Sequence, residues 1–151
     1  MRILGVRTAP SQFRYAHVES VNGNCSLLNA SSENLISIPV HLTDIDKQLQ
    51  WVKDELDRVI RQNSGLDVIA LKTAEIRGSR TKIARIGDYL DAMVLLAAAE
   101  SGIPIICKQY NQMSTTRENV LTHAQQRVNR TSVGWTVQMA DAVAVAWTAR
   151  K

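Results

Sequence analysis

The sequence predicts an α/β domain in which a mixed β-sheet is flanked by helices. Residues 12–21 alternate between two faces and are followed by Asn22-Gly23, a pattern typical of an antiparallel hairpin with a tight turn. Two short apolar runs, 66–72 and 103–108, predict strands that are buried on both faces. The helical segment between these runs predicts that the two strands are parallel, because a crossover helix joins parallel neighbours.

The first third of the chain predicts three antiparallel strands. Residues 2–7 are rich in strand-forming side chains and are followed by a turn cluster at 8–11. The alternating segment 12–21 is the second strand, and 24–30 is the third. Residues 31–43 are polar and contain a proline, so they predict an irregular connection or a short edge strand.

Four segments predict helices: about 43–61, 83–101, 114–129 and 135–149. Thr43 or Asp44 caps the first, and Ser64-Gly65 ends it. The second is apolar almost all round, so we expect it to be buried between the sheet and another layer. The last carries alanine and valine at helical spacing.

Length and composition exclude several protein classes. The 151 residues, 45% apolar and 21% charged, suit one domain spanning 1–151. No run of about 18 apolar residues predicts a membrane span, and the first residues do not resemble a secretory signal, so we expect a cytoplasmic protein. Cys25 and Cys107 form no disulfide framework, and three histidines with two cysteines make no dedicated zinc site. We interpret Cys107 as a small core residue.

Three motifs, in this order along the chain, resemble the RuvC-like branch of the ribonuclease H-like superfamily. Residues 3–7 resemble its first strand, which ends in a catalytic aspartate, and 67–72 resemble its fourth strand, which ends in a catalytic glutamate. Residues 140–146 are similar to its last helix, where an aspartate binds metal. The chain also looks like bacterial proteins of this size that carry a basic loop after the fourth strand. The resemblance implies a five-stranded sheet of order 3-2-1-4-5 with flanking helices, in which the strand at Val68 lies beside the one at Ile3.

The departures from this family concern its catalytic carboxylates. Ribonuclease H-like enzymes hold two Mg²⁺ ions, which clamp the attacking and leaving oxygens of phosphodiester hydrolysis. Here Arg7 and Lys72 stand at the first- and fourth-strand positions, only Asp141 remains, and Gln138 stands where a further helix carboxylate often sits. Mg²⁺ needs anionic oxygen ligands, and two cations would repel it. The sequence therefore predicts a catalytically degenerate domain without metal or cofactor, which binds nucleic acid or a protein partner.

Two interpretations of these residues stay open. Arg7 and Lys72 are either strand-end residues with solvated charges or substitutes for the metals that neutralise Asp141 in a positive pocket. In the second case the three side chains converge, and Asp141 bonds Arg7 or Lys72. Alternatively, Glu19 or Glu75 rebuilds a carboxylate site with Asp141, and the protein is an Mg²⁺-dependent nuclease or resolvase.

A basic segment, 72–85, follows the fourth strand. Its local charge is +4, which equals the net charge of the whole chain. Its end caps the next helix at Ser79 or Thr81, which leaves backbone N–H groups to bind an anion. The segment is either a solvated loop or a contact surface for the phosphates of DNA or RNA. The candidate phosphate-binding residues are Lys72, Arg77, Ser79, Arg80, Lys82 and Arg85.

A third hypothesis makes the protein a scaffold subunit. The apolar helix at 83–99 would then pack against a second copy of the chain. RuvC-like proteins commonly dimerise, so the resemblance implies a homodimer, and a membrane partner is not expected.

Overall fold

The computed structural model describes residues 1–75, 78 and 81–150. Six strands, four α-helices and one 3₁₀ helix follow one another in this order: β1 (Arg2–Ala9), β2 (Gln12–Val21), β3 (Asn24–Leu27), β4 (Leu35–Ser37), α1 (Ile45–Gln62), β5 (Val68–Lys72), α2 (Lys82–Ser101), β6 (Ile105–Lys108), η1 (Asn111–Met113), α3 (Val120–Arg127) and α4 (Val137–Thr148).

The sheet has the predicted topology. Its strands lie in the order β3-β2-β1-β5-β6, which confirms the predicted order 3-2-1-4-5 and the place of Val68 beside Ile3. The first three strands are antiparallel, while β1, β5 and β6 are parallel. A sixth strand, β4, pairs with residues 12–14 of β2, on the same edge of β2 that pairs with β3 at residues 18–21. The connection at 31–43 therefore includes a short edge strand. The hairpin turn has φ values of 51° at Asn22 and 84° at Gly23, as its sequence predicts.

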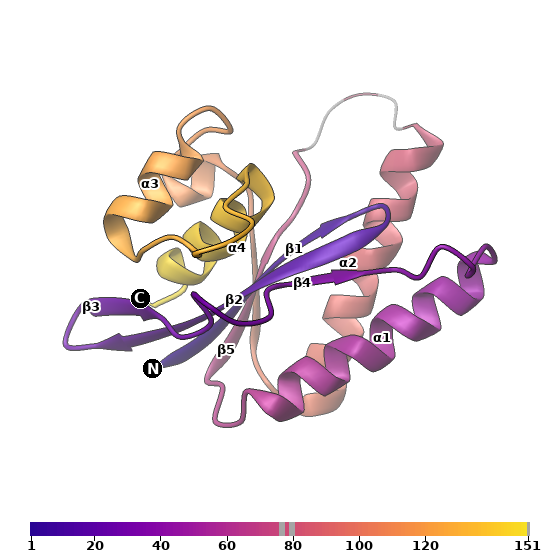
Figure 1. Cartoon of the computed structure of the whole chain (residues 1–151), viewed down its shortest axis with the longest axis horizontal. Coiled ribbons are helices and arrows are strands. Elements are labelled where there is room, and N and C mark those ends of the chain that lie inside the picture. Colours follow the sequence, from indigo (N-terminus) through magenta and orange to yellow (C-terminus); the bar gives the residue numbers. More distant parts are fainter. Residues whose placement is uncertain (76–77, 79–80, 151) are drawn as a thin grey trace.

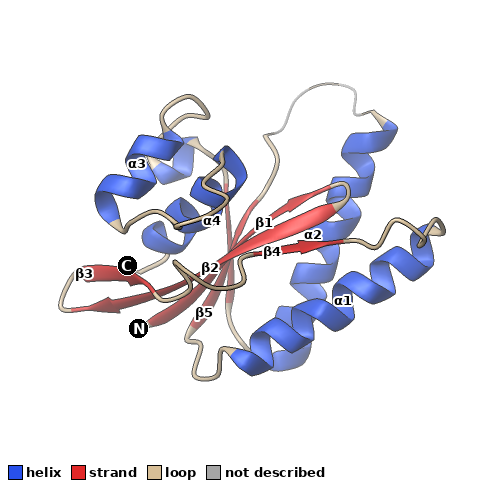
Figure 2. Cartoon of the chain, in the orientation of Figure 1, coloured by secondary structure: helices blue, strands red, loops and turns tan. Residues whose placement is uncertain are grey.

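Helices cover both faces of the sheet (Figures 1 and 2). On one face, α4 packs on β1, β2 and β5, and α3 packs on α4. On the other face, α1 and α2 pack against each other, and α2 also contacts β1 and β5. Two apolar cores result, one on each side of the sheet, because alternate residues of β1 and β2 point to opposite faces.

The prediction for the second helix was wrong. α2 buries one face, through Leu90, Val94, Ala97 and Ala98, and its other side carries exposed apolar residues such as Leu96. The helix that is buried on all sides is α4, in which residues 139–146 are all buried. α4 lies between the sheet and α3, whereas no element of the described residues covers the outer side of α2.

Three further expectations need correction. Cys107 is exposed, because β6 is the edge strand of the sheet and not a fully buried one. The third strand ends at Leu27, and residues 28–30 form a turn, in which the Leu28 N–H still donates a hydrogen bond to His17 O at 2.7 Å. The third helix spans only Val120–Arg127, because the chain turns through Ser114, which has a φ of 54°. In the described part of the chain, no helix is long and apolar enough to cross a membrane.

Gly5 sets the distance between α4 and the sheet. A Cβ atom at Gly5 would lie 2.0 Å from the carbonyl oxygen of Ala142 and 2.8 Å from the Cβ of Ala146. No side chain fits in that space, so α4 contacts the backbone of β1 directly. This close approach places Asp141, the residue before Ala142, against the end of β1.

Candidate functional site

The parallel pairing of β1 and β5 brings two cationic residues together at one edge of the sheet. Arg7 lies opposite Lys72 in the ladder, near the carboxyl end of each strand. The Arg7 Nη1 donates a hydrogen bond to the backbone oxygen of Lys72 at 3.1 Å. The Arg7 Nε lies 3.3 Å from Asp141 Oδ2, which forms an ion pair between β1 and α4. The three residues singled out from the sequence therefore lie in one site, and Asp141 pairs with Arg7.

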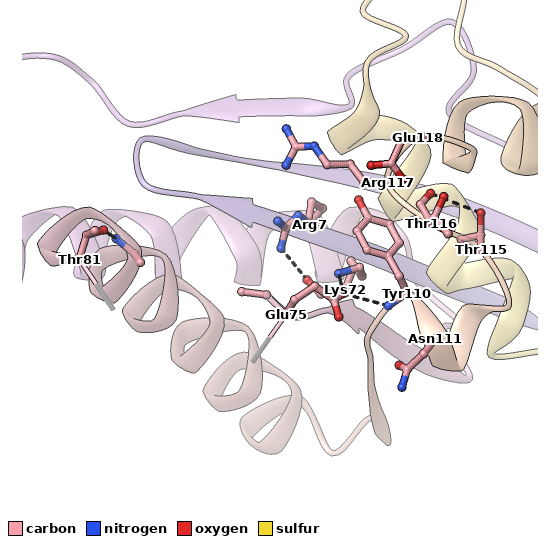
Figure 3. Close-up of a pocket in the computed structure, with 12 residues that line it drawn as sticks. Arg7, Lys72, Glu75, Thr81, Tyr110, Asn111, Thr115, Thr116, Arg117 and Glu118 are labelled. Carbon is pink, nitrogen blue, oxygen red and sulfur yellow. Dashed lines mark hydrogen bonds and ion pairs between the residues drawn. The ribbon is translucent and has the colours of Figure 1, made fainter. Parts of the chain in front are cut away.

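Lys72 is buried, so the solvated-charge interpretation is wrong for this residue. Its side chain is 1% exposed, and its Nζ donates hydrogen bonds to Thr73 O at 2.7 Å and to Glu75 Oε1 at 2.9 Å. The same ammonium lies 3.9 Å from the centre of the Tyr110 ring, a cation–π contact (Figure 3). Burial lowers the pKa of Lys72, and the hydrogen bond to Glu75 opposes that shift.

Asp141 is equally buried. Burial raises the pKa of this carboxyl group, and the charge of Arg7 and the hydroxyl of Tyr110 act in the opposite direction. The pKa of Tyr110 is raised as well, first by burial and then by the charge of Asp141. Burial therefore outweighs the ion pair with Arg7 in its effect on the Asp141 pKa.

A pocket of about 960 Å³ opens beside these residues. Its floor includes Arg7 and Lys72, and the segment before α3 forms another wall (Figure 3). Arg117 on that wall is exposed, and its charge acts to lower the pKa of Asp141. The lining residues are Arg7, Lys72, Ala74, Glu75, Thr81, Ala84, Tyr110, Asn111, Thr115, Thr116, Arg117 and Glu118.

The basic segment begins at this pocket and returns to it. Thr81 is the N-cap of α2, where its hydroxyl accepts a hydrogen bond from the backbone N–H of Ala84 at 3.1 Å. Both residues line the pocket. Lys82 and Arg85 are exposed in the first turn of α2, while Arg77, Ser79 and Arg80 lie outside the described residues.

The two alternative carboxylates lie in different places. Glu19 pairs with Arg2 at 3.0 Å, at the opposite end of β1 from Arg7, so the hypothesis that Glu19 rebuilds a carboxylate site is wrong. Glu75 does join the site, through Lys72. Gln138 bonds Gln12 at 2.7 Å and belongs to a smaller adjoining pocket of about 190 Å³.

The donor set does not suit Mg²⁺. Among the described residues, no group of three or more histidine, cysteine, aspartate or glutamate side chains could hold a metal ion. A guanidinium group lies against Asp141, the carboxylate that the resemblance places at a metal position, and another carboxylate of the site, Glu75, bonds an ammonium group. Metal binding would bring a dication next to two existing cations.

Three features of this region were not predicted from the sequence: Tyr110, Arg117 and the partly buried pair of Thr8 with Asp91. The Thr8 hydroxyl donates a hydrogen bond to Asp91 on α2, and burial raises the pKa of that carboxyl group. Tyr110 follows β6 by two residues, so the position of β6 beside β5 gives a signal for Tyr110. Arg117 lies in a turn region with no motif of its own.

Comparisons with known proteins identify the fold. The structure is similar to Thermus thermophilus RuvC in complex with Holliday junction substrate, with a TM-score of 0.80, 16% identity and coverage of 98% of this chain and 92% of that chain. A second structure of Thermus thermophilus RuvC gives a TM-score of 0.78 at 16% identity and the same coverage. The yeast mitochondrial Holliday junction resolvase Ydc2 gives 0.62 at 14% identity, over 98% of this chain and 79% of that chain.

No protein-family model matches the sequence, and no curated protein matches it. The chain has the RuvC-like form of the ribonuclease H-like fold.

Proposed function

We propose that this protein binds nucleic acid at the pocket beside β1 and β5 and does not cleave phosphodiester bonds. The observation that carries the proposal is the Arg7–Asp141 ion pair at 3.3 Å, since a guanidinium group neutralises the one carboxylate at a family metal position. A nucleic-acid partner is supported by the fold, because the similar Thermus thermophilus RuvC structure contains a Holliday junction substrate.

The charge around the pocket favours phosphate as the bound group. Lys72 and Arg117 line the pocket, and Lys82 and Arg85 extend the basic surface along the first turn of α2. Lys and Arg side chains and backbone N–H groups at helix N-termini supply most protein contacts to nucleic-acid phosphates. Such contacts do not read base sequence, so affinity should depend weakly on sequence and strongly on salt.

Salt dependence of binding tests this proposal. Replacing Arg77, Arg80 and Lys82 together with alanine is expected to weaken binding of a fluorescein-labelled duplex, and to reduce the slope of log K against log salt by about 0.9 for each lost phosphate contact. Fluorescence anisotropy at several salt concentrations measures both quantities.

The matched control replaces three cations that do not line the pocket, namely Arg2, Lys47 and Arg61, with alanine. This variant loses the same formal charge, so it is expected to retain most of the slope. If the unaltered protein shows no measurable binding at low salt, or if the two variants give equal slopes, the proposal that this surface binds nucleic acid is wrong.

A metal-dependent nuclease is the second candidate function. Glu75 bonds Lys72 and lies in the same site as Asp141, so two carboxylates are present at this edge of the sheet. The solved structures that share the fold include RuvC bound to a Holliday junction substrate. In that case a divalent ion would have to displace both cations from their carboxylates. Metal-dependent cleavage of DNA would distinguish this function from binding alone.

A homodimer is the third proposal. Tyr89, Ala92 and Leu96 form an exposed stripe on α2, and Tyr89 and Leu96 are 48% and 43% exposed. A second copy of the chain, acting with this one in the cytoplasm, would cover this apolar surface. Sedimentation at several protein concentrations tests this proposal.

A further inference from the structure

Two hydrogen-bond donors converge on a single oxygen atom beside the pocket. The Lys72 Nζ lies 2.9 Å from Glu75 Oε1, and the backbone nitrogen of Tyr110 lies 3.0 Å from the same oxygen. A buried ammonium group and a backbone N–H are the donors that proteins commonly offer to a phosphate oxygen. The Lys72 ammonium and the Tyr110 N–H therefore resemble an anion-binding site, and the Glu75 carboxylate is the anion that they bind within the protein (Figure 3).

Lys72 is the fixed member of this pair and Glu75 the accessible one. The Lys72 side chain is 1% exposed, whereas that of Glu75 is 30% exposed. Lys72 is held further by Thr73 O at 2.7 Å and by the face of the Tyr110 ring. Rotation of the Glu75 side chain into solvent would leave both donors in place and facing the pocket.

We propose that the Lys72 ammonium and the Tyr110 backbone N–H form a phosphate-binding site, which Glu75 occupies until a phosphate group of the ligand replaces it. This inference deepens the proposed nucleic-acid binding and rests on it for the identity of the ligand. The exchange is physically reasonable because one anion replaces another. Lys72 stays paired throughout, so the large cost of a buried unpaired charge does not arise.

The remaining pocket groups explain why a phosphate would compete with an internal carboxylate. Glu75 has the advantage of being tethered to the site. A nucleic-acid phosphate brings neighbouring phosphates with it. The exposed cation Arg117 lines the pocket, and Lys82 and Arg85 are exposed next in sequence to the lining residues Thr81 and Ala84. Contacts at several phosphates add to the affinity, whereas Glu75 offers a single carboxylate group.

The substitution Glu75→Gln tests the inference without opening a cavity. The glutamine amide oxygen can still accept hydrogen bonds from Lys72 and Tyr110, and Thr73 O still accepts one from Lys72. The variant therefore keeps the hydrogen bonds of the site while the competing negative charge is removed. Binding of a short fluorescein-labelled DNA duplex at fixed salt is expected to tighten by about fivefold to tenfold, because a charge-assisted hydrogen bond no longer has to be exchanged.

Glu118→Gln is the matched control. Glu118 lines the same pocket, so this variant loses the same charge at a residue that accepts neither of these two hydrogen bonds. We expect it to tighten binding by no more than about twofold, as for a solvent-exposed charge. Glu75→Gln that binds no more tightly than Glu118→Gln, or more weakly than the unaltered protein, would overturn the inference.

The amide resonance of Tyr110 gives a second readout that separates this inference from the proposed function. Titration with inorganic phosphate, followed by ¹H–¹⁵N NMR, is expected to shift this resonance in Glu75→Gln at lower phosphate concentration than in the unaltered protein. If DNA does not bind but this difference is present, the anion site stands and the nucleic-acid function fails. If DNA binds and the Tyr110 amide shifts equally in both proteins, the nucleic-acid function stands and the site at Lys72 is wrong.

Discussion

Asp141→Ala is expected to destabilise the folded protein by about 2–4 kcal/mol, because it removes the polar side chain that α4 places beside Arg7 and leaves a cavity next to a largely buried cation. Asp141 is 1% exposed and pairs with Arg7, which also holds the backbone of Lys72. The substitution therefore loosens the contact between β1 and α4 as well as the ion pair. Urea unfolding followed by circular dichroism measures the change in the free energy of unfolding.

Asp141→Asn is the control for this experiment, since it keeps the shape and hydrogen-bonding capacity of the side chain. We expect it to change the stability by less than about 1 kcal/mol at neutral pH, because the neutral amide resembles the protonated carboxyl group that burial favours, and it still places an oxygen beside Arg7. A loss for Asp141→Ala no larger than that for Asp141→Asn would contradict a role for this pair in stability.

The stability of the unaltered protein relative to Asp141→Asn depends on pH, because burial raises the pKa of Asp141. In the unfolded chain an aspartate ionises near its ordinary pKa of 3.8, whereas in the folded protein burial raises that value. As pH rises through this interval, the unfolded state loses its proton first, so the unaltered protein loses stability relative to Asp141→Asn. Above the raised pKa the difference becomes constant. A gain in relative stability over the same interval would mean that Arg7 outweighs burial.

Gly5→Ala is expected to cost about 3 kcal/mol or more, because its methyl group would overlap the backbone of α4 and overpacking displaces whole elements. The Cβ would lie 2.0 Å from Ala142 O, so α4 has to move away from β1. That movement would also separate Asp141 from Arg7. Urea unfolding measures the loss, and weaker DNA binding is expected alongside it.

Gly87→Ala is the matched control for Gly5→Ala. A Cβ at Gly87 on α2 has no neighbouring atom within 4 Å, and the position has no positive φ. Alanine there is expected to stabilise the protein by up to about 1 kcal/mol, since glycine is a poor helix former. Equal effects of the two substitutions would mean that α4 does not approach β1 as closely as described.

Local chemistry accounts for the parts of the fold that sequence predicted correctly. Residues 12–21 form β2 with the predicted bounds, because strict alternation and the Asn22-Gly23 turn both specify that hairpin. The sheet order followed from the resemblance to a known family. The buried helix was misassigned because α2 and α4 are both apolar, and composition does not reveal which helix will be covered by another one.

The part of the candidate site that lies at the carboxyl ends of β1 and β5 could be predicted from the sequence. Arg7, Lys72 and Asp141 were brought together by the fold that the sequence resembles, and Glu75 lies three residues beyond Lys72. Glu19 could have been excluded from the sequence, because the tight turn between β1 and β2 places it opposite Arg2 and far from Arg7. Tyr110 could have been expected from the place of the preceding strand β6 beside β5, whereas Arg117 reaches the pocket through a turn that no local pattern specifies.

Metal dependence of strand cleavage tests the central claim most directly. The protein is incubated with junction, duplex and single-stranded DNA in the presence of Mg²⁺ or Mn²⁺, and metal binding is measured by titration calorimetry. We predict that DNA is bound but not cleaved and that no metal binds, since cations pair with both Asp141 and Glu75. Metal-dependent cleavage that Asp141→Asn abolishes in a protein that remains folded would contradict the account and establish a nuclease.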